Sequence, residues 1–157
     1  MGTETMERKQ RILVVDDEPS TRKYLKVLLE VDGCDVEAVS SGKDAISKIA
    51  NGDRPDFIFL DVLMPEINGL DTLQELMRMD QSLNVIMTSC STAFGTIAEA
   101  FRLGARDYLV LPFAKAELKG AMLRTKQRKQ DQLLWVQRRI SRLSMNEQIQ
   151  FWATSNL

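Results

Sequence analysis

The chain has 157 residues, 44% of them hydrophobic and 27% charged, which suits one globular domain of roughly 100–150 residues with an extension. Histidine is absent, and Cys34 and Cys90 lack the spacing of metal ligands, which excludes a Cys/His metal site and a His-dependent catalytic triad. The net charge of −1 combines an acidic body, with 12 Lys and Arg against 19 Asp and Glu in residues 1–113, and a basic tail, with 9 against 3 in residues 114–157.

Five short apolar runs, rich in β-branched residues, have the length and composition of buried strands. They cover residues 12–15, 36–39, 57–60, 85–87 and 108–111. Helical patterns separate them, so strand and helix alternate along the chain. Right-handed crossovers then predict a doubly wound α/β fold, with a parallel sheet covered by helices on both faces.

The first helix is expected to begin at Pro19-Ser20, which offers a cap, and to end at Asp32-Gly33. Its predicted inward face consists of Tyr24, Val27, Leu28 and Val31.

The next three helices are predicted from Ser40-Ser41 to Asn51-Gly52, from about Gly69 to Met79 and over about residues 92–103. In the third helix the inward residues are Leu70, Leu73, Leu76 and Met77, and in the fourth they are Ile97, Ala100 and Phe101.

The fifth helix is predicted to run from Lys115 to about Asn146, far longer than an average globular helix. It carries a heptad-like apolar seam that is interrupted by Lys126 and Lys129. The seam consists of Leu133, Val136, Ile140 and Leu143, extended backwards by Leu118 and Met122. We therefore expect a domain over residues 10–125 and a helical, coiled-coil-like extension or linker over residues 126–157.

Acidic residues follow two of the predicted strands: Asp16 and Asp17 follow the first, and Asp61 follows the third. Either group alone is equally well explained as a loop that caps the next helix. If the two strands are neighbours, however, their ends lie about 5 Å apart, and the carboxylates repel one another unless a proton or cation intervenes. An oxygen-only site of this kind suits Mg²⁺.

Three segments resemble the motifs of response-regulator receiver domains, in matching order and spacing over about residues 10–125. Ile12-Leu-Val-Val-Asp-Asp-Glu-Pro19 resembles the opening of such a domain, Asp61-Val-Leu-Met-Pro-Glu-Ile-Asn-Gly69 its phosphoacceptor loop, and Gly104-Ala-Arg-Asp-Tyr-Leu-Val-Leu-Pro-Phe113 its fifth strand. The resemblance implies a CheY-like (flavodoxin-like) sheet of strand order 2-1-3-4-5. Within the family, the chain most resembles the receivers of NtrC-type enhancer-binding regulators.

Carried over residue by residue, the resemblance implies that Asp61 accepts a phosphoryl group. Asp16 and Asp17 would hold Mg²⁺ together with Asp61 and the backbone carbonyl of Leu63. Ungapped counting places the family's switch hydroxyl at Ser89 rather than at its neighbour Thr88, and the switch aromatic at Tyr108. Leu63 and Ser91 occupy positions that tune phosphate hydrolysis in relatives. The only catalysis implied is the domain's own phosphorylation and dephosphorylation.

Leu111 departs from the family pattern, which usually has Lys immediately before the proline that follows strand five. The missing ammonium would pair with phosphoryl oxygens. Two interpretations follow: Asp61 is still phosphorylated but is coupled differently to Ser89 and Tyr108, or the domain is a degenerate receiver that acts by protein contact without phosphate. The intact Asp16, Asp17 and Asp61 favour the first. The resemblance also implies a cis bond before Pro112.

The implied phosphoryl donor is a sensor histidine kinase, and we expect a cytoplasmic protein because no apolar run approaches the length of a membrane span. A homodimer is expected through the face of the fourth helix, fifth strand and fifth helix and through the C-terminal helix. The basic tail lacks aromatic interleaving and flanks an apolar seam, which favours a solvated coiled-coil face over a DNA-binding arm. DNA contact is therefore expected only through an output domain beyond this sequence.

Two other classes fit the residues poorly. A haloacid-dehalogenase-type phosphatase needs a second acid two residues after its nucleophile, where this chain has Leu63. A flavodoxin-like cofactor binder needs a Ser/Thr/Gly-rich loop after the first strand, where this chain has Asp16-Asp-Glu-Pro19. The phosphate-independent dimerisation module remains as the alternative, because of Leu111.

Overall fold

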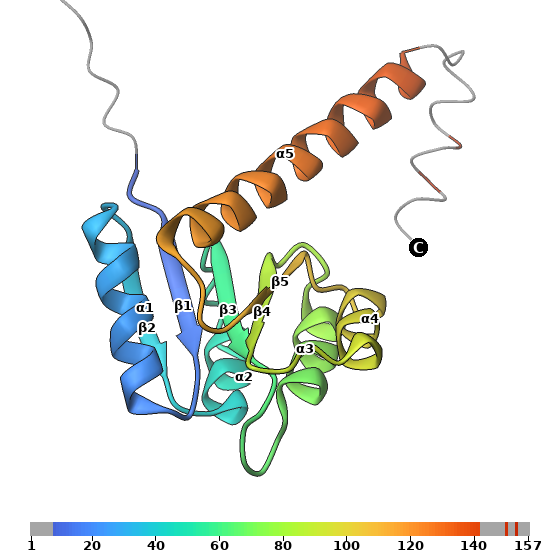
Figure 1. Ribbon diagram of the computed structural model, residues 1–157. Coiled ribbons are helices and arrows are strands. Elements are labelled where there is room, and N and C mark those ends of the chain that lie inside the picture. Colours follow the sequence, from blue (N-terminus) through green and yellow to red (C-terminus); the bar gives the residue numbers. More distant parts are fainter. Residues whose placement is uncertain (1–7, 142–149, 151–152, 154–157) are drawn as a thin grey trace, which may run out of the picture. The chain divides into compact units, whose positions relative to one another are not determined.

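The computed structural model describes residues 8–141, 150 and 153, in which strands and helices alternate (Figure 1). The strands are β1 (Arg11–Val15), β2 (Asp35–Val39), β3 (Phe57–Asp61), β4 (Val85–Ser89) and β5 (Asp107–Val110). The helices are α1 (Pro19–Val31), α2 (Gly42–Ala50), α3 (Gly69–Met79), α4 (Phe94–Arg102) and α5 (Lys115–Ile140). None of the helices in the described part of the chain has an apolar stretch long enough to span a membrane.

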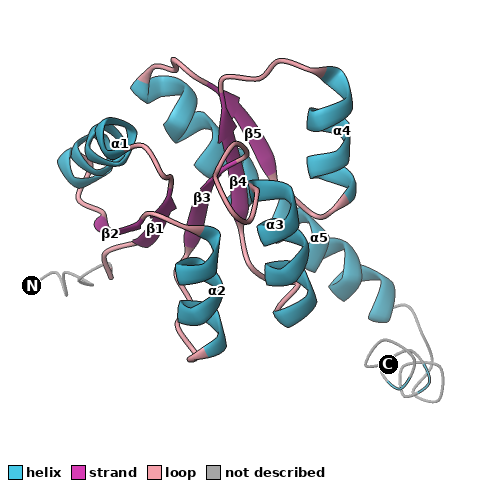
Figure 2. Ribbon diagram, turned by 90° about the horizontal axis from the view of Figure 1, so that it is seen from below, coloured by secondary structure: helices cyan, strands magenta, loops and turns pink. Residues whose placement is uncertain are grey.

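All strand pairs of the sheet are parallel, and the strand order is β2-β1-β3-β4-β5, which confirms the predicted topology. The carboxyl ends of the strands lie at the lower edge of the sheet in Figure 1, and Figure 2 views the molecule from that side. Sites of doubly wound folds form at this edge, beyond the strand ends.

The core has one layer on each face of the sheet, because successive strand residues point to opposite faces. Leu60 and Met87 belong to the first core cluster, with residues of α2, α3 and α4. Phe59 and Ile86 belong to the second core cluster, with residues of α1 and the first turns of α5. This division fixes the face to which each residue near the strand ends points.

The predicted inward face of α1 is confirmed for Leu28, which packs against the second core cluster, and is wrong for Tyr24, Val27 and Val31. Leu25 and Leu29 are its buried residues, whereas Tyr24 is 44% and Val31 70% exposed. The helix carries two neighbouring apolar stripes, and only contact with the sheet decides between them. The predicted cap is wrong as well, because Glu18 is the N-cap residue and Ser20 lies inside the helix.

Helices α2 and α3 begin and end as predicted, and Ser41 caps α2 by accepting a hydrogen bond from the backbone N–H of Asp44. Helix α4 begins later than predicted, at Phe94. Its Ala100 is buried, as expected, but Phe101 is 44% exposed.

The chain divides into two compact units, Met1–Met122 and Leu123–Leu157, and α5 continues from the first into the second. Leu118 and Met122, the predicted backward extension of the apolar seam, pack in the second core cluster. Leu133, in the seam itself, is exposed. The predicted helical residues 142–146, with Leu143, lie outside the described residues.

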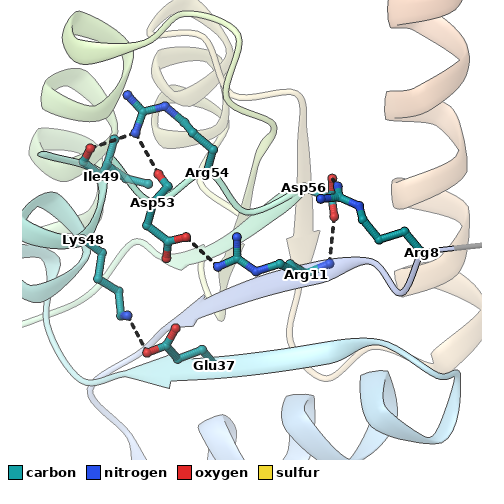
Figure 3. Close-up of polar contacts among 8 residues, drawn as sticks. All are labelled: Arg8, Arg11, Glu37, Lys48, Ile49, Asp53, Arg54 and Asp56. Atoms are coloured by element: carbon teal, nitrogen blue, oxygen red, sulfur yellow. Dashed lines mark hydrogen bonds and ion pairs between the residues drawn. The ribbon is translucent and has the colours of Figure 1, made fainter. Parts of the chain in front are cut away.

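Ion pairs gather at the amino end of β1 and in the loop before β3 (Figure 3). The side chain of Arg11 donates to Asp53 at 2.5 Å, and Arg8 donates to Asp56 at 2.8 Å. Arg54 donates to the carbonyl oxygens of Ile49 and Asp53, and Lys48 pairs with Glu37. Arg11 holds the pKa of Asp53 below its usual range. Cationic side chains therefore pair with Asp53, Asp56 and Glu37 in this region.

Candidate functional site at the carboxyl edge

Three aspartates meet at the opposite, carboxyl edge of the sheet. Asp16 and Asp17 directly follow β1, and Asp61 is the last residue of the neighbouring strand β3. One carboxylate oxygen from each residue lies within 4.8 Å of the others. The structure thus brings together the three residues that the sequence predicted as metal ligands.

Two of these carboxylates are buried: Asp16 is 2% and Asp61 8% exposed, whereas Asp17 is exposed. Backbone N–H groups donate to both buried carboxylates, from Glu18 to Asp16 at 2.9 Å and from Leu63 to Asp61 at 3.2 Å. Within the described part of the chain, none of the three forms an ion pair. The guanidinium of Arg22 lies nearby and donates to the backbone carbonyl oxygen of Asp16 at 2.8 Å, and its charge opposes the rise in the pKa of Asp16 without forming an ion pair.

Burial and the negative charge of Asp16 raise the pKa of Asp61 to about 7. Burial also raises the pKa of Asp16, against the hydrogen bond from the backbone N–H of Glu18. Both shifts arise because the site disfavours additional negative charge, and a cation at this position would reverse them.

The residues fit a magnesium ion. Mg²⁺ prefers carboxylate, carbonyl and water oxygens at about 2.0–2.1 Å. Asp16, Asp17 and Asp61 offer three such oxygens within 4.8 Å of one another, and they would bind one ion together if they moved closer. The carbonyl oxygen of Leu63, the fourth predicted ligand, belongs to the loop that follows Asp61, and the side chain of Leu63 is exposed.

A close approach by Gly69 positions this loop. The N–H of Gly69 donates to the carbonyl oxygen of Val62 at 2.8 Å. A Cβ atom at position 69 would stand 1.9 Å from the carbonyl oxygen of Asp61 and 2.7 Å from the Cα atom of Val62. Only glycine lets the start of α3 lie this close to the end of β3.

Ser89 and Tyr108, the predicted switch residues, are both held by the backbone of Ser91. The hydroxyl oxygen of Ser89, a fully buried residue, accepts from the N–H of Ser91 at 3.1 Å. The hydroxyl of the half-buried Tyr108 donates to the carbonyl oxygen of Ser91 at 3.1 Å. The two side chains therefore share one backbone unit in the β4–α4 loop.

Thr88 lies opposite Asp61 in the register of β3 and β4. Leu111 follows β5 directly and packs against the second core cluster, and the Leu111–Pro112 bond is cis, as predicted. Sequence reasoning set Thr88 aside in favour of Ser89. The strand register is the signal that singles it out, and a single sequence does not contain that register.

A family profile for the response regulator receiver domain matches residues 12–123. Over 114 residues, the chain is 32% identical to the chemotaxis protein CheY of Thermotoga maritima, covering 72% of this chain and 94% of that protein. It is 37% identical over 118 residues to the probable transcriptional regulator ycf27 of Guillardia theta, covering 73% of this chain and 44% of the relative. This chain thus spans about half the length of several of its curated relatives.

A solved structure of the response regulator protein TrrA from Thermotoga maritima, in complex with Mg²⁺ and BeF, is similar in fold. Its TM-score to this chain is 0.67 at 30% identity, and the similarity covers 74% of this chain and 98% of TrrA. The span matched by the family profile, the strand order of the sheet and the sequence identity to CheY together show that the chain belongs to the response regulator receiver domain family of two-component systems.

Proposed function

We propose that this chain accepts a phosphoryl group on Asp61, with Mg²⁺ bound by Asp16, Asp17, Asp61 and the backbone carbonyl of Leu63. The convergence of three carboxylate oxygens within 4.8 Å, in a site where none of the described residues forms an ion pair with them, carries this proposal. Such a cluster is costly for a fold to maintain. It is consistent with a site that a divalent cation completes.

The reaction needs a nucleophilic oxygen in line with the phosphorus. A carboxylate oxygen of Asp61 attacks the phosphorus of the donor, and a new P–O bond forms as the bond to the leaving group breaks. The leaving group, imidazole from a phosphohistidine or acetate from acetyl phosphate, takes the electron pair. A bound magnesium ion supplies positive charge over the phosphoryl oxygens and the carboxylates.

Asp61 acts as the nucleophile only in its deprotonated form. Its pKa of about 7 means that the carboxyl group is partly protonated near neutral pH when the site holds no cation. The N–H of Leu63 already donates to this carboxylate and fixes its orientation.

We propose Ser89 and Tyr108 as the residues that report phosphorylation. When the Ser89 hydroxyl turns toward a phosphoryl oxygen, it releases the N–H of Ser91, whose carbonyl oxygen accepts from Tyr108. The backbone of Ser91 thus links Ser89, at the end of β4, to the side chain of Tyr108 on β5. Loss of one contact weakens the constraint on the other.

A second candidate function, a phosphate-independent dimerisation module, is favoured by Leu111. Its half-buried side chain packs against the apolar second core cluster and has no donor for a phosphoryl oxygen. The intact acidic cluster favours phosphorylation over this alternative, because a module without phosphate chemistry has no use for three crowded carboxylates.

The test is intact-protein mass spectrometry after incubation with acetyl phosphate and Mg²⁺. We expect the wild-type chain to gain the mass of one phosphoryl group, and Asp61→Asn or removal of Mg²⁺ by a chelator to abolish the gain. The variant Leu111→Lys is the reference for a restored family pattern. The absence of an adduct on the wild type, under conditions that label Leu111→Lys, would show that the domain is degenerate.

The partners and context are part of the same proposal. The donor is a sensor histidine kinase, the protein acts in the cytoplasm, and residues 126–157 link a receiver at residues 10–125 to an output domain that binds DNA. The chain spans 44% of the probable transcriptional regulator ycf27, and this partial coverage supports the proposal of an additional output domain. The NtrC-type placement stays a prediction.

A further inference from the structure

Thr88 shares with Asp61 a face of the sheet and its carboxyl edge. The two residues are partners in the register of β3 and β4, and the N–H of Val62 donates to the carbonyl oxygen of Thr88 at 3.1 Å. Phe59 and Ile86, two residues before them, both lie in the second core cluster. Because side chains alternate along a strand, Asp61 and Thr88 point to that same face, and paired strands are about 4.8 Å apart.

The hydroxyl of Thr88 is buried without a partner. The residue is 1% exposed, and its Oγ1 atom forms no hydrogen bond with any described residue. Buried hydroxyl groups nearly always have a hydrogen-bond partner, and leaving one unsatisfied costs free energy. An exception beside a functional carboxylate suggests a partner that arrives with a ligand.

Ser89 does not have this property. Its hydroxyl oxygen already accepts from the N–H of Ser91, and alternation places its side chain on the face of the first core cluster, with Tyr108. On the face of Asp61, the corresponding positions are Thr88 in β4, Leu109 in β5 and Leu111 just after β5. Of these three side chains, Thr88 alone carries a hydrogen-bond donor.

We propose that the Thr88 hydroxyl donates a hydrogen bond to a phosphoryl oxygen on Asp61, and so supplies from β4 part of what an ammonium group at position 111 would supply. This inference rests on the proposed phosphorylation of Asp61. It explains in one step why a buried hydroxyl has no partner and how the site functions with Leu111. Thr88 and Ser89 then bind the phosphoryl group from opposite faces of the same strand.

The test compares Thr88→Val, which removes the hydroxyl at nearly constant shape, with Thr88→Ser, which keeps it. The initial rate of adduct formation from acetyl phosphate and the affinity for beryllofluoride, both with Mg²⁺, are measured for each variant. We expect Thr88→Val to lower both by roughly ten-fold, as for the loss of one hydrogen bond to a charged oxygen. Thr88→Ser retains most of both. The urea midpoint of Thr88→Val without Mg²⁺ stays unchanged or rises, because no contact is lost.

A double-mutant cycle with Leu111→Lys separates this role from a packing effect. With an ammonium group present on the same face, Thr88→Val loses less than in the wild-type background, and the two substitutions are not additive. Equal labelling and equal affinity of wild type and Thr88→Val overturn the role of Thr88 and leave phosphorylation of Asp61 intact. A wild type that binds neither probe overturns the proposed function, and this inference falls with it.

Discussion

Asp61 lies where burial and two neighbouring carboxylates all favour its protonated form. A carboxylate that acts as a nucleophile could also be solvent-exposed and fully ionised, so nucleophilicity alone does not require burial. Here the same burial that raises the pKa also excludes water and strengthens every interaction with a bound cation. If the cluster binds a cation as we propose, its burial lowers the stability of the protein without the cation and raises the affinity for the cation.

Replacement of Asp61 by Asn is predicted to stabilise the metal-free protein above neutral pH. The folded-state pKa of about 7 lies above the unfolded value, so the folded state binds more protons and stability falls as pH rises between about 4 and 7. Asp61→Asn removes this loss and gains on the order of 2 kcal/mol at pH 8. The gain vanishes near pH 4. Urea denaturation at several pH values measures it.

The control is Asp131→Asn, a substitution of an exposed residue on α5, which leaves stability nearly unchanged at every pH. Added Mg²⁺ stabilises the wild type at neutral pH and not Asp61→Asn. A variant that is less stable than the wild type at pH 8 without Mg²⁺ contradicts the interpretation of Asp61 as a destabilised charge.

The acidic residues of the site could be predicted from sequence because their chemistry depends on residue type and on their position after a strand. Asp16, Asp17 and Asp61 meet as expected. Thr88 could not be singled out, because its importance comes from register and from the absence of a hydrogen-bond partner. Neither property is visible in a single sequence.

At the scale of elements, the turn between β3 and α3 depends on Gly69. Gly69→Ala would place a Cβ atom against backbone atoms of Asp61 and Val62, which cannot move away as a side chain can. We expect a loss of about 2 kcal/mol or more in unfolding free energy, and weaker Mg²⁺ binding, because the loop that carries Leu63 shifts. Urea denaturation and calorimetric titration with Mg²⁺ measure the two effects.

Gly95→Ala is the matched control, a glycine in α4 where an added Cβ meets no atom within 4 Å. Alanine favours helix over glycine by up to about 1 kcal/mol, so this variant keeps or gains stability. If Gly69→Ala and Gly95→Ala have the same unfolding free energy and the same Mg²⁺ affinity, the turn between β3 and α3 does not depend on the close approach at Gly69.

Element boundaries followed from capping residues and strand length, and this is why α2 and α3 begin and end as predicted. The faces of α1 and α4 were harder to predict. Apolar side chains cover more of these helices than the sheet buries, so Val31 and Phe101 remain exposed. The sheet, rather than the periodicity of the helix, selects the buried stripe.

At the scale of the whole molecule, the two edges of the sheet differ in how their charges are neutralised. The amino edge pairs Arg8, Arg11 and Lys48 with carboxylates (Figure 3). At the carboxyl edge, none of the described residues forms an ion pair with the acidic cluster. This uneven distribution supports the proposal that chemistry takes place at the carboxyl edge.

Oligomeric state separates a phosphorylation switch from a constitutive scaffold. If phosphorylation controls pairing through α4, β5 and α5, beryllofluoride with Mg²⁺ increases the dimer fraction of the wild type and leaves Asp61→Asn unchanged. Size-exclusion chromatography with light scattering measures both proteins. A dimer that forms equally without beryllofluoride, and in both proteins, indicates the phosphate-independent module.

The most direct measurement of the central claim locates the phosphoryl group on the chain. Borohydride reduces an acyl phosphate of aspartate to homoserine and releases phosphate, and tandem mass spectrometry identifies the converted residue. After treatment with acetyl phosphate and Mg²⁺, homoserine is expected at position 61 alone. Conversion at Asp16 or Asp17, or no conversion at all, contradicts the assignment of Asp61 as the phosphoryl acceptor.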